Sequence, residues 1–312
     1  MADRHGDNIV MAMSAATGKV RVHTDHGVFD VHEPKNTKDI KRSPDKPLWL
    51  ESMQIEVDTI EGNETYHLRQ KKDLPPNVRI FRLAWKFKVK RDGTGKLDKR
   101  KARLVLMGNM LVAGHHFADT FAIGARMASV KLVFAVTGVM KWKFDFLIDI
   151  SGAYLNAWRP STGPGSWIVS NQPEMFEKTG PNGEELFAVH DKYLYGDPAS
   201  GRAWQHVFDD FIKSDGGLGG VCTTTDTNLF RVVNAHGHAI FAKHVDEIIG
   251  VANSAEMRTF INDSICARFK VSESGPWSTV LGFTVTNNVS DGIVSMGSER
   301  IIADGAARFL ST

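Results

Sequence analysis

The chain has 312 residues, 42% hydrophobic and 24% charged, with a formal net charge of +2, which is ordinary for a globular protein of one or two domains. A net charge this small gives no argument for a nucleic-acid partner, and no apolar run is long enough to cross a membrane. Cys222 and Cys266 have no zinc-site spacing and the N-terminus has no apolar signal core, so we expect an intracellular protein, cytoplasmic or alternatively nuclear.

The first 46 residues are expected to form an N-terminal extension and linker, ordered or disordered. Short strands are predicted at 20–23 and 28–31, and residues 35–47 are polar, basic and proline-containing, as in a linker. A helix is predicted from Pro47 to Ile60, because apolar residues recur there at helical intervals. Its apolar stripe is interpreted as core and not as a cofactor site.

A hairpin rich in basic residues is predicted next. Lys86, Lys88 and Lys90 alternate with apolar residues, which indicates a strand with one basic and one buried face. A turn at Asp92-Gly93 leads into a returning strand at 102–106. The residues leave two interpretations open: a solvated lysine face, or a positive β-ribbon that grips a phosphate backbone or a nucleoside triphosphate.

The first candidate catalytic residue is Asp149. A buried helix is predicted at 128–141 and a strand at 144–150, with Asp149 inside the apolar end of that strand. A lone buried carboxylate is costly, so this position is expected to have a partner or a metal ion.

A second acidic position lies in a later hairpin. Residues 239–251 form two apolar runs around Asp246 and Glu247, which predicts two strands with both carboxylates at the tip of the turn. One interpretation is a solvated acidic turn. The other, which Asp149 favours, is that two distant strands bring carboxylates to one point and bind magnesium for phosphoryl transfer.

The remaining elements surround this hairpin. Amphipathic helices are predicted at 198–214 and 254–268, a hairpin at 280–296, and a final helix from Ser298 to Leu310. A different metal-site hypothesis, zinc binding, has these candidate ligands: His236, His238, His244 and Cys222. Their spacing matches no structural zinc pattern, so the carboxylate hypothesis is preferred.

Five motifs, in order along roughly residues 47–312, resemble the reverse transcriptase of copia-type retrotransposons. They are the basic hairpin with Lys101-Ala102-Arg103-Leu104-Val105, Asp119-Thr120-Phe121-Ala122 with Ala125-Arg126-Met127, Ile148-Asp149-Ile150 with Gly152-Ala153-Tyr154-Leu155-Asn156, Leu194-Tyr195-Gly196 with Arg202-Ala203-Trp204, and His244-Val245-Asp246-Glu247. Each motif alone has little specificity, whereas five in order with fitting spacing point to descent from this family.

The resemblance implies an α+β fold: a right-hand polymerase with fingers, an antiparallel palm sheet backed by helices, and a partial thumb. The implied domains are the extension and linker at 1–46, the fingers and fingers–palm junction at 47–145, the palm at 146–275, and a primer-seating hairpin with the start of a thumb or connection at 276–312. The implied activity is RNA-directed DNA synthesis. Its implied partners are an RNA template, a DNA primer and deoxynucleoside triphosphates, with no membrane.

The resemblance also assigns roles to side chains. The catalytic positions are Asp149, Asp246 and Glu247. Asp149 and Asp246 are the implied ligands of magnesium, with manganese as the alternative ion. The implied nucleotide-binding residues are Lys101 and Arg103 at the triphosphate and Tyr154, whose ring excludes a ribose 2′-hydroxyl. The implied nucleic-acid contacts are Lys86, Lys88, Lys90 and Arg202.

Three positions depart from the family pattern. Glu247 stands where a second Asp is expected, His244 replaces an aromatic residue, and Ala199 falls where the family has a Gln that touches nucleotide and template. A carboxylate misplaced by about 1 Å can cost about a hundredfold in rate. Two hypotheses follow: a reverse transcriptase domain, active or impaired, and a catalytically degenerate remnant that keeps only the fold and nucleic-acid binding.

Overall fold

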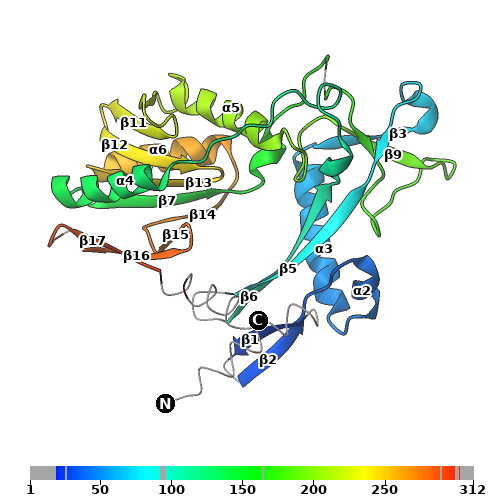
Figure 1. The fold of residues 1–312 in the computed structure, drawn as a ribbon, viewed down its shortest axis with the longest axis horizontal. Helices are drawn as coiled ribbons and strands as arrows, with labels where there is room; N and C mark the ends of the chain where they lie inside the picture. The colour runs from blue at the N-terminus through cyan, green and yellow to red at the C-terminus, as the bar shows by residue number, and fades with distance from the viewer. Residues whose placement is uncertain are drawn as a thin grey trace. The chain divides into compact units, whose positions relative to one another are not determined.

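The computed structural model describes residues 19–24, 27–91, 96–163, 165–288, 290–298 and 302. These residues form two compact units, and Figure 1 labels most of their helices and strands. The described part of the first unit comprises the chain up to Ala118 and the segment Trp158–Ser200, and the second unit comprises Asp119–Ala157 and Gly201–Ile302. No described helix is both long and apolar enough to span a bilayer.

The first unit is built from small sheets and short helices. β1 pairs with β2, β5 pairs with β6, and a four-stranded sheet has the order β3-β9-β8-β4. The bounds are β1 (Lys19–Thr24), β2 (Gly27–His32), α2 (Thr37–Arg42), α3 (Lys46–Gly62), β3 (Tyr66–Gln70), η1 (Lys71–Asp73), β4 (Ile80–Phe81), β5 (Leu83–Arg91), β6 (Leu97–Leu106), η2 (Gly108–Met110), β8 (Val169–Ser170) and β9 (Leu186–His190).

The expected linker at 35–47 is wrong in its centre, because α2 occupies residues 37–42. The Asn36 side chain caps this helix by accepting a hydrogen bond from Asp39 N at 3.1 Å. Ile40 is fully buried. One capping residue and one apolar anchor therefore order a segment whose composition is otherwise polar. The strands expected at 20–23 and 28–31 are confirmed by β1 and β2.

The predicted helix and basic hairpin are both confirmed. α3 buries its predicted apolar stripe, and β5 and β6 form an antiparallel ribbon, whereas the turn expected at Asp92-Gly93 lies outside the described residues. Side-chain oxygens accept hydrogen bonds from backbone N–H groups on the outer edges of this ribbon. Ser52 and Glu56 of α3 accept from Ala102 N and Leu104 N at 2.8 and 3.1 Å, and Glu33 accepts from Val89 N at 2.7 Å. Such pairing protects edge strands from association.

The second unit contains a six-stranded antiparallel sheet of order β10-β11-β12-β13-β7-β14 and a three-stranded sheet of order β15-β16-β17. The bounds are α4 (Met127–Met140), β7 (Phe144–Ile150), η3 (Ala153–Asn156), α5 (Ser200–Lys213), β10 (Val221–Cys222), β11 (Leu229–Asn234), β12 (Gly237–His244), β13 (Glu247–Ala252), α6 (Ala255–Arg268), β14 (Val271–Gly275), β15 (Thr279–Val280), β16 (Phe283–Asn288) and β17 (Ile293–Gly297).

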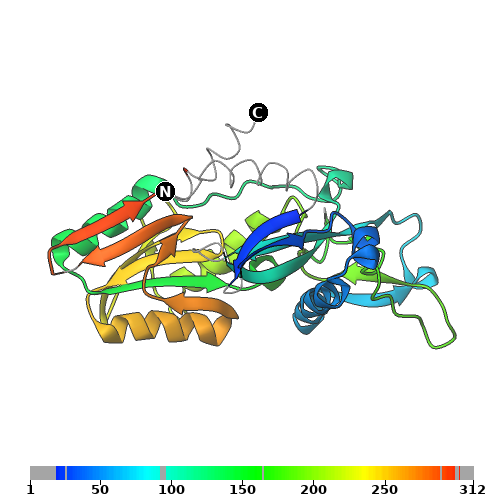
Figure 2. The same cartoon turned by 90° about the horizontal axis from the view of Figure 1, so that it is seen from below.

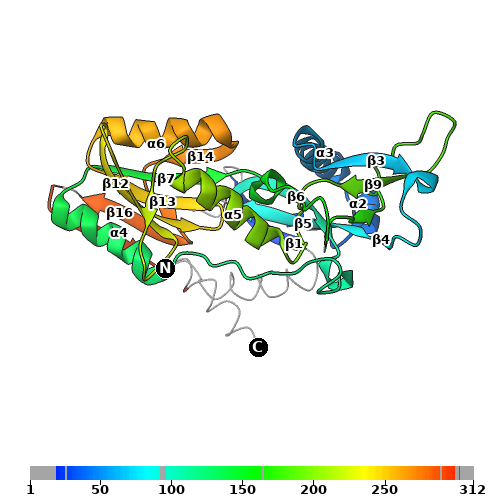
Figure 3. The ribbon, with the colours of Figure 1, turned by 90° about the horizontal axis from the view of Figure 1, so that it is seen from above.

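Alternation along β7 decides which side chains face which layer. Phe146 and Ile148 belong to the core shared with α5 and α6, whereas Leu147 belongs to the core shared with α4 and the β15–β17 sheet. Figure 3 shows α6 and α4 on opposite sides of the sheet, and Figure 2 shows β16 and β17 on the side of α4. Since successive strand residues point to opposite faces, Asp145 and Asp149 share the α4 face with Leu147.

The structure confirms the α+β expectation of antiparallel sheets backed by helices. The predicted helices at 128–141, 198–214 and 254–268 correspond to α4, α5 and α6, and Ser254 caps α6 as its sequence suggests. The final helix expected from Ser298 to Leu310 lies outside the described residues, apart from Ser298 and Ile302.

One buried ion pair joins α5 to β12 and supplies a test of the fold. Lys243 is 2% exposed, and its ammonium donates to Asp209, which also lies 3.8 Å from Lys213. Breaking a buried pair leaves one charge uncompensated, whereas replacing both partners by apolar residues is often nearly neutral. We expect Lys243→Met to lower the free energy of unfolding by about 3 kcal/mol, and Lys243→Met with Asp209→Leu to recover most of that decrease. Urea denaturation measures both, and an undiminished stability of the single variant would contradict the buried pair.

Candidate active site

Three carboxylates from two parts of the chain lie side by side in the second unit. β13 pairs with β7 in a register that places Glu247 opposite Asp149. Asp246 directly precedes Glu247, and its backbone carbonyl accepts a hydrogen bond from Ile150 N at 3.0 Å. The structure therefore brings together all three of the expected catalytic residues.

The turn that carries Asp246 is tighter than expected. His244 pairs with Glu247, so the turn consists of Val245 and Asp246, and Glu247 is the first residue of β13 and not part of the tip. Val245 has φ +59, in the left-handed region where a two-residue turn normally places glycine. The Trp204 indole donates to Val245 O at 2.8 Å and so helps to hold this conformation. A strained residue at such a position is typical of functional sites.

Glu247 has an environment that disfavours its charge. Burial raises the pKa of its carboxyl, and the neighbouring Asp246 and Asp149 raise it further. Its Oε2 atom is buried and has no hydrogen-bond partner. A buried carboxylate oxygen without a donor, beside two further carboxylates, fits a divalent cation, because the cation would offset both the burial and the mutual repulsion.

The carboxylates are adjacent but do not form a preassembled three-ligand site. In the described part of the chain, no three His, Cys, Asp or Glu side chains converge as ligands of one metal ion. Magnesium commonly takes only one or two protein carboxylates and completes its shell with water and phosphate, so Asp149 and Asp246 are sufficient in number. The zinc hypothesis gains no support, because the candidate ligands are not among any such group in the described residues. One of them, His236, is instead stacked on Phe260, with 5.1 Å between ring centroids.

The expectation that Asp149 is a buried lone carboxylate is wrong. Asp149 is partly exposed, and the buried carboxylate of β7 is Asp145. Asp145 accepts hydrogen bonds from Trp277 N at 2.7 Å and Asn287 Nδ2 at 2.9 Å. Sequence reasoning missed this structural residue, although its alternation with Leu147 placed it on the face that Asp149 shares.

The imidazole ring of His244 packs against the backbone of Gly124 and Ala125. Its Nδ1 lies 3.3 Å from Ala125 O, and a Cβ added to Gly124 would lie 2.7 Å from the imidazole ring. Ala125 N in turn donates to Lys243 O at 2.9 Å. The segment around Gly124 therefore lines the end of β12, and the absence of a side chain at Gly124 makes room for the histidine.

The expected phosphate-binding residues form a ladder of opposed cations on the first unit. Across the β5–β6 ribbon, Lys86 pairs with Arg103, Lys88 with Lys101, and Lys90 with Lys99. We call these six residues the basic ladder. Like charges directly opposite each other destabilise a sheet, so a ladder of three such pairs is an electrostatic cost that a polyanion would remove.

Neighbouring side chains only partly compensate the basic ladder. Burial lowers the pKa of the Lys101 ammonium, and Arg103 and Lys90 lower it further, while Glu56 opposes the shift. The Arg103 guanidinium lies 4.4 Å above the Tyr195 ring, and Lys88 is 3.4 Å from a Glu33 oxygen. The three lysines of β5 remain exposed.

The other predicted site residues are held in different ways. Tyr154 lies on η3 and packs against the core shared by β7 and α5. Arg202, on the first turn of α5, is paired with Asp119 at 3.1 Å. Ala199, at the expected Gln position, is buried. Sequence analysis did not recognise Trp204 and Gly124 as parts of the site. The hydrogen bond from Trp204 to Val245 and the packing of His244 against Gly124 join distant residues, so a local sequence pattern does not reveal them.

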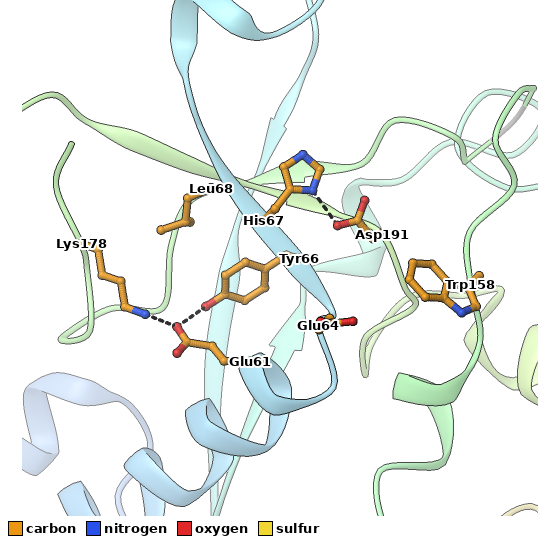
Figure 4. A pocket seen from close by; sticks show the side chains of 8 residues that line it. All are labelled: Glu61, Glu64, Tyr66, His67, Leu68, Trp158, Lys178 and Asp191. Atoms are coloured by element: carbon orange, nitrogen blue, oxygen red, sulfur yellow. Dashed lines mark hydrogen bonds and ion pairs between the residues drawn. The ribbon is translucent and has the colours of Figure 1, made fainter. Parts of the chain in front are cut away.

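A cavity of about 480 Å³ hollows the first unit but lacks this chemistry (Figure 4). Four of its lining side chains are paired with each other: His67 Nδ1 is 2.6 Å from Asp191, and Lys178 is 2.6 Å from Glu61. Trp158 is exposed at its rim. The carboxylate cluster of Asp149, Asp246 and Glu247 is therefore the better candidate for catalysis.

The chain is similar in sequence to known proteins. The family model described as "Reverse transcriptase (RNA-dependent DNA polymerase)" matches residues 63–300. The retrovirus-related Pol polyprotein from transposon TNT 1-94 of Nicotiana tabacum is 26% identical over 283 residues, which cover 90% of this chain and 20% of that protein. The corresponding polyprotein from transposon RE2 of Arabidopsis thaliana is 27% identical over 225 residues, covering 72% and 15%. The chain spans about a fifth or less of the length of these relatives.

Among solved structures, the chain matches a foamy viral protease–reverse transcriptase in complex with double-stranded DNA. The TM-score is 0.44 and the sequence identity 16%, with 80% of this chain and 35% of that chain covered.

The strained turn supplies a test of the site geometry. A non-glycine residue in the left-handed region costs about 1–3 kcal/mol, and glycine itself costs about 0.5–1 kcal/mol in unfolded-state entropy. We therefore expect Val245→Gly to raise the free energy of unfolding by about 1 kcal/mol. The matched control is Val233→Gly at an exposed position of β11, which should lower it by about the same amount. Chemical denaturation compares them, and an equal decrease in both variants would refute the strain at Val245.

Proposed function

The chain belongs to the reverse transcriptase (RNA-dependent DNA polymerase) family, and we propose that it is the domain of a copia-type retrotransposon Pol polyprotein that extends a DNA primer on an RNA template. The observation that carries this proposal is the register of β13 on β7, which places Glu247 opposite Asp149, next to Asp246, whose backbone carbonyl is bound by Ile150 N. The second unit is the palm and the first contains the fingers. The domain boundaries expected at 46, 145 and 275 stay a prediction.

The carboxylate cluster is the catalytic centre in this proposal. Asp149 and Asp246 hold magnesium, or manganese in its place, and Glu247 contributes a third negative charge. When bound, such ions activate the primer 3′-hydroxyl and neutralise the charge that develops on the phosphates. The unpartnered Oε2 atom of Glu247 and the raised pKa of its carboxyl support a cation at this place.

The remaining side chains bind and select the substrates. The basic ladder holds phosphates, with Lys101 and Arg103 at the deoxynucleoside triphosphate and the lysines of β5 on the template–primer. Arg202 also contacts nucleic acid. Tyr154 excludes a ribose 2′-hydroxyl, and the core packing that fixes its ring supports this role. Phosphate contacts of this kind give affinity without sequence preference.

Primer extension on an RNA template tests the catalytic assignment. Asp246→Ala should reduce synthesis to background, because it removes a cation ligand. Glu247→Asp should raise the rate, by up to about a hundredfold, because it restores the shorter carboxylate. The assay uses magnesium and, separately, manganese, with product length read on a denaturing gel.

The possible results separate the two hypotheses. Synthesis that Asp246→Ala abolishes would establish an active polymerase. Synthesis only after Glu247→Asp would identify an enzyme impaired at this position. If neither folded protein makes DNA, the polymerase proposal is wrong and the chain is a remnant, whose binding of RNA–DNA hybrid is then the property to measure.

The basic ladder predicts a salt-dependent affinity. Lys88→Ala with Lys90→Ala should weaken binding of an RNA–DNA hybrid and lower the slope of log affinity against log salt by about 1 for each phosphate that is no longer neutralised. Lys71→Ala, an exposed lysine of η1 outside the ladder, is the matched control and should leave the slope unchanged. Fluorescence anisotropy at several salt concentrations measures this. If Lys71→Ala lowers the slope as much as the double variant does, the basic ladder is not the binding surface.

A further inference from the structure

An irregularity in β14 lies directly against Asp149. Val271 pairs with Ile150 and Glu273 pairs with Asp149, with a shift of register between them, so that Ser272 is an additional residue on the bulged strand. Bulges are common beside active sites, where they redirect one side chain. Here the redirected side chain is a hydroxyl that reaches the expected metal ligand.

Ser272 makes two contacts with Asp149. Its Oγ donates to the carboxylate oxygen Oδ1 and also lies 3.3 Å from the backbone oxygen of the same residue. Ser272 is exposed, so it contributes little to the core and its contact with Asp149 is its main interaction.

Asp149 needs such a partner for a physical reason. The final torsion of an aspartate side chain is broad, so the carboxylate does not settle in one orientation by itself. Repulsion from Asp246 and Glu247 also disfavours an orientation of this carboxylate toward the cluster. One donor at Oδ1 opposes both effects and leaves Oδ2 available.

We propose that Ser272 is a positioning residue of the catalytic centre: its hydroxyl orients the Asp149 carboxylate so that the second oxygen binds the divalent cation. The proposal rests on the function proposed above, because it takes Asp149 as a cation ligand. Hydrogen-bond partners that orient metal ligands typically change metal affinity by about 10–100-fold when they are removed.

The same strand offers a matched control. Ser274 is also an exposed serine of β14, but its hydroxyl lies 2.5 Å from Asn262 Oδ1, and it makes no contact with Asp149. Ser274→Ala therefore removes a hydroxyl from the same strand without changing the carboxylate cluster. Ser272→Thr keeps the hydroxyl and suits a β-strand.

The decisive measurement is the affinity for Mn²⁺ alone, followed by electron paramagnetic resonance of the free ion. We expect Ser272→Ala to weaken Mn²⁺ binding by about tenfold. Ser272→Thr and Ser274→Ala should stay close to the wild-type value, and Asp149→Asn should abolish binding. Circular dichroism without metal establishes that every variant is folded. Wild-type affinity in Ser272→Ala, an equal weakening in Ser274→Ala, or no Mn²⁺ binding by the wild-type protein would each overturn the proposal.

Kinetics of primer extension separate this proposal from the proposed function. Ser272→Ala should raise the magnesium concentration for half-maximal rate and lower kcat at limiting magnesium, with KM for template–primer unchanged. If the wild-type protein makes no DNA, the polymerase function fails, yet the Mn²⁺ comparison still decides whether Ser272 orients Asp149. If DNA is made but Mn²⁺ binding does not depend on Ser272, only the positioning role fails.

Discussion

The pairing of β13 with β7 is the constraint on which the candidate centre depends. Because Glu247 lies opposite Asp149 and follows Asp246, three carboxylates are held closer than their charges favour. The fold resists this repulsion with fixed contacts: Ile150 N donates to the backbone of Asp246, and Trp204 holds the strained turn at Val245. Folding energy is thus used to hold the three carboxylates beside one another.

A second cluster of like charges has the opposite sign. The basic ladder places cation opposite cation along the β5–β6 ribbon, and α3 and Glu33 stabilise the ribbon through its edges while they compensate the ladder only in part. An acidic cluster suits divalent metal ions and a basic ladder suits phosphates. The reverse transcriptase function proposed above would use both kinds of charge.

The departures from the family pattern have different structural settings. His244 fits a space that Gly124 leaves open, so its immediate neighbours are matched to it. Glu247 keeps a carboxylate in the cluster but leaves one oxygen buried without a donor. Ala199 is buried and has no polar group with which to touch a nucleotide. Of the three, Glu247 has the most direct bearing on chemistry, because it shares the electrostatic environment of Asp149 and Asp246.

The sequence by itself determined the family, through five motifs in order, and the elements with clear periodicity, such as α3, β5 and β7. These elements depend on local alternation and helical spacing, which consecutive residues carry. Only the tertiary structure decided that α2 is a helix, that Asp145 and not Asp149 is the buried carboxylate, and that Glu247 begins a strand. It alone placed Ser272 on Asp149. Burial, register and bulges depend on the partner strand or on the layer that covers the sheet. A local sequence pattern does not identify that partner.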